Sequence, residues 1–207
     1  MITAAEVLAV AGPVAIAGGW LVVRRGVSLW VVNGTLLPVL GALAVLSGRP
    51  TATGGSPVGG AILCGALAGV ALYGATALFL RVAGRWPPLA RHTAELYDNR
   101  SEVSFATAFI ISVALAAPAE ELLWRGVVLP VLQGWTGSAI AAAAVSWLVY
   151  VGANAVNGSV PIVLGAVVGG AVWTVLAFDG GGVAACMACH MAWTGLMVAV
   201  PPIRRTP

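Results

Sequence analysis

The sequence is poor in charge. Only 8% of its 207 residues are charged, whereas a soluble globular domain carries about 25%. Hydrophobic residues make up 60% of the chain, and no long polar insert separates the apolar segments. These deficits exclude a soluble globular fold and a second domain folded in water. We expect an all-α, polytopic transmembrane helical bundle in which residues 1–207 form a single domain.

Lysine is absent, and all ten basic residues are arginines. No basic run with interleaved aromatic residues occurs, which excludes a nucleic-acid partner. The arginines lie beside apolar segments instead, where positive charge indicates topology. The first residues contain Glu6 and neither lysine nor arginine, so the positive region of a cleaved signal peptide is missing. We therefore expect the first apolar segment to be retained as a span.

Seven apolar segments approach the roughly 20 residues that a membrane span needs. They cover residues 3–23, 27–47, 58–82, 103–133, 138–156, 160–178 and 182–201. The charged stretch between the third and fourth segments predicts a short interfacial helix near residues 88–99. The fourth segment is too long for one straight span, so we expect either a break at Pro118 or first turns that lie in the interface.

The distribution of arginine predicts the orientation in the membrane. With seven spans and an outside N-terminus, the cytoplasmic side holds eight arginines and the opposite side holds Arg49 alone. The eight are Arg24, Arg25, Arg81, Arg85, Arg91, Arg100, Arg204 and Arg205. Because positive loops stay cytoplasmic, we expect a multi-pass plasma-membrane protein with its N-terminus outside and its C-terminus in the cytoplasm.

Two adjacent carboxylates, Glu120 and Glu121, lie inside the fourth apolar segment. A charge at the bilayer centre costs about 2.5–3.5 kcal/mol on insertion scales, so an ionisable residue there indicates a functional site. Arg125 follows Glu121 by four residues and shares its helix face, which predicts an ion pair. Glu120 lies about 100° around the helix and can face another neighbour. The alternative is a buried ion-pair cluster that only fixes helix packing.

Polar side chains also mark two later apolar segments. Tyr150, Asn154 and Asn157 fall on one helical stripe, and His190 and Thr194 are four residues apart. The first three segments carry almost no polar side chains. This asymmetry predicts a site built from the C-terminal half of the chain.

Together these residues resemble the CAAX protease and bacteriocin-processing (CPBP, or Abi) family of intramembrane endopeptidases, over a core of about residues 103–200. The family's first motif, Glu-Glu-x-x-x-Arg, is matched by Glu120, Glu121 and Arg125. Its second motif, Phe-x-x-x-His, falls on Tyr150 and Asn154. Its third, His-x-x-x-Asn or Asp, falls on His190 and Thr194. Order and spacing agree for all three.

The resemblance implies a role for each motif. Glu120 would be the base that activates a water, and the rest of the first motif would brace the site. The second-motif histidine holds that water in the family, and Asn154 stands in its place. His190 and Thr194 would stabilise the oxyanion of the tetrahedral intermediate. The implied substrate is a membrane protein or peptide that enters from the lipid bilayer.

No cofactor is expected. Glu120, Glu121 and His190 would offer three zinc ligands, but Asn154 replaces the histidine that would complete the set, so we favour a metal-free glutamate mechanism. A non-catalytic scaffold that binds partner membrane proteins is the main alternative, because the second and third motifs are altered. A proton-coupled transporter is a weaker one, since the two halves show no repeat symmetry.

A third hypothesis is that the chain is a c-type haem protein. Cys186, Cys189 and His190 match the attachment pattern C-x-x-C-H. Against it, His190 falls roughly 13 Å into the last span at 1.5 Å per residue. His92, the other histidine, lies in a predicted cytoplasmic loop, where it cannot serve as the second axial ligand.

Overall fold

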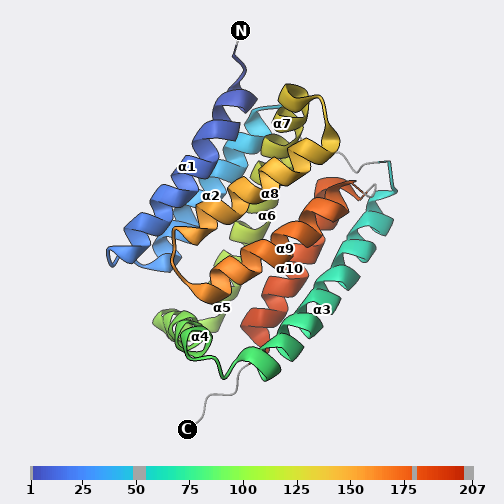
Figure 1. Ribbon diagram of the computed structural model, residues 1–207. Coiled ribbons are helices and arrows are strands. Elements are labelled where there is room, and N and C mark those ends of the chain that lie inside the picture. Colours follow the sequence, from blue (N-terminus) through green and yellow to red (C-terminus); the bar gives the residue numbers. More distant parts are fainter. Residues whose placement is uncertain (1, 49–54, 179–180, 203–207) are drawn as a thin grey trace.

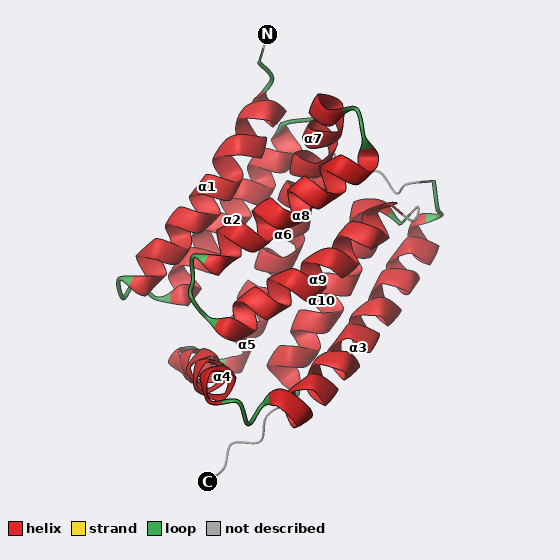
Figure 2. Ribbon diagram, viewed as in Figure 1, coloured by secondary structure: helices red, strands yellow, loops and turns green. Residues whose placement is uncertain are grey.

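The computed structural model describes residues 2–48, 55–178 and 181–202, and every regular element among them is helical (Figure 2). Among the described residues, six helices are long and apolar enough to cross a membrane. They are α1 (Ala4–Arg24), α2 (Leu29–Leu46), α3 (Val58–Ala83), the composite helix Phe105–Thr136, α9 (Val160–Phe178) and α10 (Gly182–Ala199). A shorter apolar helix, α8 (Ala139–Ala155), has 17 residues and a length of about 25 Å. The predicted all-α, polytopic bundle is confirmed.

The apolar helices run alternately up and down the bundle, so that α1 begins at one end and α10 finishes at the other (Figure 1). The pair α1 and α2 forms one flank, and α3 packs along α10 on the other. The composite helix Phe105–Thr136 lies between them and contacts both α2 and α10 through its middle part. This central position places the two adjacent glutamates in the core.

The composite helix has 32 residues and is continuous. It consists of α5 (Phe105–Phe109), a π-helical stretch (Ile110–Ala116), α6 (Ala117–Leu123), a second π-helical stretch (Trp124–Val128) and α7 (Leu129–Thr136). Pro118 and Pro130 are each the second residue after a π stretch. A widened turn accommodates a proline, which has no N–H to donate and whose ring crowds the carbonyl four residues earlier. Of the two alternatives for this segment, the break at Pro118 is therefore wrong.

The short helix predicted near residues 88–99 is α4 (Pro87–Asn99), which crosses the end of the bundle (Figure 1). Two side-chain hydrogen bonds attach it to the spans. Trp30 of α2 donates to the carbonyl of Asn99 over 2.7 Å, and Tyr97 donates to the carbonyl of Met197 over 3.3 Å. Burial raises the pKa of Tyr97 to about 12, so its phenol keeps the donating proton at neutral pH.

The described arginines support the expected clustering of positive charge. The last turns of α1 and α3, which contain Arg24 and Arg81, lie at the same end of the bundle as α4 (Figure 1). Arg49, Arg204 and Arg205 are outside the described residues. Which end faces the cytoplasm stays a prediction from the positive-inside rule.

Small residues bring α3 and α10 into close contact. Gly65 and Gly69 form a G-x-x-x-G pattern in α3, a spacing that lets membrane helices approach closely. Gly65 lies against the backbone of Ala185, and Gly69 lies against the carbonyl oxygen of Cys189. Because His190 follows Cys189, this contact sets the position of the only histidine in the predicted site.

We expect Gly69→Ala to destabilise the bundle by about 1–3 kcal/mol, the usual range for overpacking. The added Cβ would collide with the backbone carbonyl of Cys189, which cannot move without shifting α10. The measurement is the apparent Tm of the detergent-solubilised protein. Gly74→Ala in the same helix is the matched control, because no described atom lies within 4 Å of a Cβ at that position. Equal Tm changes in the two variants would contradict this account.

Candidate active site

Glu121 is the most deeply buried ionisable residue of the site, with a fully covered side chain. Arg125 Nη1 lies 3.1 Å from both of its oxygens and donates a hydrogen bond to Oε1. His190 Nδ1 lies 2.9 Å from the same Oε1. Since a carboxylate only accepts, Nδ1 carries the hydrogen of this bond. The predicted ion pair is present, and it extends to the last helix.

Arg125, on the composite helix, contacts residues of both α8 and α9. Its Nη2 donates to the carbonyl of Gly170 over 2.9 Å and lies 3.4 Å from the hydroxyl of Thr174, both on α9. Its guanidinium also lies over the rings of Tyr150 and Trp173, 5.1 and 5.5 Å from their centroids. These contacts compensate the buried positive charge with an anion, a carbonyl and two aromatic faces.

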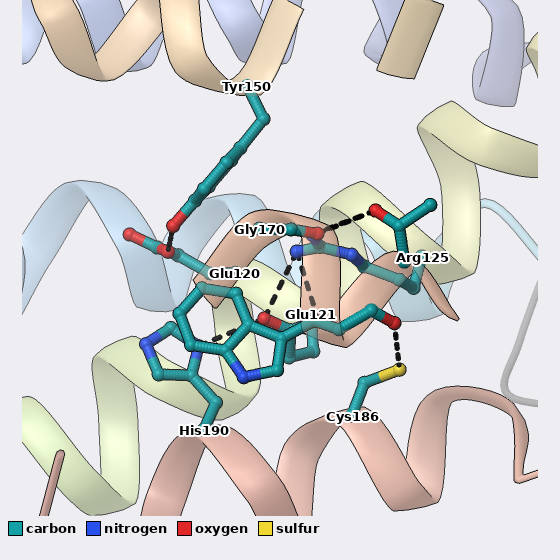
Figure 3. A network of polar contacts seen from close by, with 9 residues as sticks. Glu120, Glu121, Arg125, Tyr150, Gly170, Cys186 and His190 are labelled. Atoms are coloured by element: carbon teal, nitrogen blue, oxygen red, sulfur yellow. Dashed lines mark hydrogen bonds and ion pairs between the residues drawn. The ribbon is translucent and has the colours of Figure 1, made fainter. Parts of the chain in front are cut away.

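Glu120 faces a different partner. The hydroxyl of Tyr150, on α8, donates to its Oε2 over 3.1 Å. Figure 3 shows the two glutamates with separate partners, Glu120 with Tyr150 and Glu121 with Arg125 and His190. Glu120 is only half-buried, whereas Glu121 is sealed. The two carboxylates therefore face different neighbours, as expected from their separation of about 100° around the helix axis.

Two tryptophans complete the site, and the sequence predicted a role for neither. Trp173 stacks on the His190 ring, with centroids 3.9 Å apart and planes 18° from parallel. Trp124 packs edge-on against Tyr150 at 5.1 Å. The only sequence signal for Trp124 is its place beside Arg125. Trp173 lies in a segment without charged residues, and its role depends on neighbours from other helices.

A cavity of about 510 Å³ extends from α4 to Glu120. Its polar lining brings together five residues singled out from the sequence: Glu120, Tyr150, Asn154, His190 and Thr194. Most of the remaining lining consists of apolar side chains from α2, α3, α4 and α9. Glu121 and Arg125 are not among the residues that line the cavity. The cavity thus offers one carboxylate and one imidazole to the same interior space.

The Asn154 side chain is engaged at both ends. Its Oδ1 accepts from Trp20 Nε1 over 3.1 Å, and its Nδ2 donates to the carbonyl of Tyr150 over 3.0 Å. Trp20 belongs to α1, so the site also depends on the N-terminal half, which the sequence did not predict. Asn157 lies beyond the end of α8, where it accepts from the backbone of Ser159 over 3.1 Å.

The described residues do not fit the metal or haem that the sequence allows. They contain no group of three histidine, cysteine or acidic side chains that could hold a metal ion. Cys186 and Cys189 are both fully buried, and Cys186 donates its thiol hydrogen to the carbonyl of Trp173 over 2.9 Å. Haem attachment would need both sulfur atoms accessible, and His190 is already bonded to Glu121.

The fold and this cavity define a multi-pass membrane protein with a polar, ionisable site inside its helical bundle. The model of one protein family, described as Type II CAAX prenyl endopeptidase Rce1-like, matches residues 102–196. That match confirms the resemblance to the CPBP family, and it spans the candidate site from Glu120 to Thr194. No curated protein and no solved structure matches the chain.

Proposed function

We propose that this protein is an intramembrane endopeptidase that hydrolyses peptide bonds through a water activated by Glu120. The observation that carries the proposal is the division between the two carboxylates. Glu121 is sealed in an ion pair with Arg125, whereas Glu120 borders the cavity that His190 and Thr194 also line. A general base must reach water and substrate, and of the two carboxylates it is Glu120 that borders the cavity.

In this mechanism Glu120 accepts a proton from water as the water oxygen bonds to the scissile carbonyl carbon. The carbonyl oxygen becomes an oxyanion, which His190 and Thr194 stabilise. The carbon–nitrogen bond then breaks, and the proton held by Glu120 passes to the leaving amine. One water is consumed, and a carboxylic acid and an amine are formed.

The orientation of His190 suits a donor to that oxyanion. Its Nδ1 is bonded to Glu121, so Nε2 is the nitrogen left for the substrate. When the ring carries both protons, Nε2–H donates to the oxyanion and the Glu121 carboxylate balances the charge. Stacking on Trp173 keeps the ring in this plane. Glu121, Arg125 and Trp173 thus act by positioning.

The substrate proposed for this site is an apolar segment of a membrane protein or membrane-associated peptide. The mostly apolar wall of the cavity would cover such a segment, and α4 lies at its interfacial end. The description of the matched family adds prenylated CAAX ends as one substrate class to examine. We propose a metal-free reaction, since no described three-ligand cluster is present.

The test is cleavage by the full-length protein in proteoliposomes. Apolar peptides and prenylated C-terminal peptides are supplied, and products are identified by mass spectrometry. We expect new peptide ends with the wild-type protein, and the same ends with a zinc chelator present. Folded protein that cuts no peptide in the set would contradict the proposal and favour the scaffold alternative.

One observation favours that scaffold. Asn154 stands where the family has histidine, and its amide is bonded to Trp20 and to the Tyr150 carbonyl. If the site hydrolyses peptides, we expect Asn154→His to raise kcat about tenfold, because an imidazole adds one hydrogen bond to the water. Cleavage rates per folded protein provide the measurement. Asn157→His, one turn further and outside the cavity, is the control and should leave kcat unchanged. Absence of cleavage by both the wild-type protein and Asn154→His would support the scaffold.

A further inference from the structure

The hydroxyl of Tyr150 is, among the described residues, the one side-chain donor that reaches the Glu120 carboxylate. Its ring is held firmly. Trp124 and Trp173 pack edge-on against it at 5.1 and 6.2 Å, and the Arg125 guanidinium lies over its face. The side chain is only 5% exposed. A ring enclosed in this way keeps its hydroxyl at a constant place in the site.

The second motif as it stands in this chain supplies the hydroxyl of this contact. Tyr150 stands at the phenylalanine of Phe-x-x-x-His, and a phenylalanine would fill the same space without a hydroxyl. The chain therefore has an added donor at position 150 and a missing imidazole at position 154. Asn154 in turn donates to the Tyr150 carbonyl over 3.0 Å, which connects the two altered positions.

We propose that Tyr150 is a positioning residue that orients Glu120 for water activation, an inference that rests on the proposed function. The terminal torsion of a glutamate is broad, so a carboxylate without a partner rotates freely. The Tyr150 hydrogen bond occupies Oε2 and leaves Oε1 to accept the proton of the water. Tyr150 touches neither water nor substrate in this scheme and acts only through Glu120.

The test is Tyr150→Phe in the full-length protein, which keeps the ring and its aromatic contacts and removes one oxygen. We expect kcat per folded protein to fall about 10- to 100-fold, the effect of one hydrogen bond to a charged group, with KM unchanged. The infrared carboxylate band of Glu120, assigned by its disappearance in Glu120→Gln, should also shift. A purely structural role would move neither the band nor the ratio of kcat to KM.

Tyr73→Phe is the matched control. Its hydroxyl donates to the carbonyl of Val200 over 2.6 Å, outside the cavity, so its loss should alter neither kcat nor the Glu120 band. An unmoved band in Tyr150→Phe would overturn the proposal, as would kcat at the wild-type level. The band also distinguishes a failure of the Tyr150 proposal from a failure of the proposed function. If the protein cleaves nothing, the proposed function fails, while a shifted band still shows that Tyr150 orders Glu120.

Discussion

Glu120→Gln is expected to lower kcat by about 100- to 10,000-fold, the range that a general base contributes. Glutamine has nearly the same shape and still accepts the hydrogen bond from Tyr150 through its side-chain oxygen. It cannot take up the proton of the attacking water. The variant should therefore fold, insert and bind peptide normally while cleavage is lost. Cleavage rates in proteoliposomes, together with peptide affinity, measure the two effects separately.

The matched control is Glu95→Gln. Glu95 belongs to α4, is largely exposed, and forms only a long ion pair with Arg91 at 3.8 Å. The same chemical change there should leave kcat unchanged. If Glu120→Gln turned over at the wild-type rate on a verified substrate, Glu120 would not be the base and the hydrolytic mechanism would be wrong.

Arg125→Met is expected to cost about 3–5 kcal/mol in stability, the effect of leaving one member of a buried ion pair uncompensated. The Glu121 carboxylate would remain fully buried without its cation. The bonds from Arg125 to Gly170 and Thr174 would be lost as well, which loosens α9. We expect a marked fall in apparent Tm and in the yield of monodisperse protein.

Two further variants identify the cause of this loss. Arg91→Met removes an arginine from an exposed pair, with side chains 69% and 62% accessible, and should change stability by about 0–1 kcal/mol. Adding Glu121→Gln to Arg125→Met removes the uncompensated charge while keeping an acceptor for His190. We expect this double variant to recover much of the lost Tm. Failure to recover would show that the contacts with α9, rather than the buried charge, account for the defect.

The two glutamates illustrate how a membrane bundle can give two adjacent carboxylates different surroundings. Glu121 pairs with Arg125 and accepts a bond from His190, so it connects its own helix to α10. Glu120 receives one hydrogen bond and borders the cavity. Adjacent positions on one helix thus obtain different environments, because a step of about 100° turns them toward different neighbours.

The sequence by itself determined the helices and the local pairing. Apolar segments of nearly span length became α1, α2, α3, α9 and α10 with ends close to those predicted, because a backbone within lipid must satisfy its own hydrogen bonds. The Glu121–Arg125 pair followed from a spacing of four residues on one helix. The break expected at Pro118 failed because π turns, which no residue pattern signalled, accommodate the proline.

Only the tertiary structure decided which polar groups meet. Glu120 and Tyr150 are 30 residues apart, Glu121 and His190 are 69 apart, and Trp20 and Asn154 are 134 apart. Such pairs depend on how the helices pack, which small residues on facing helices permit and which no local pattern encodes. The stacking of Trp173 on His190 and the cavity beside Glu120 arise in the same way, since each is formed by side chains from separate helices.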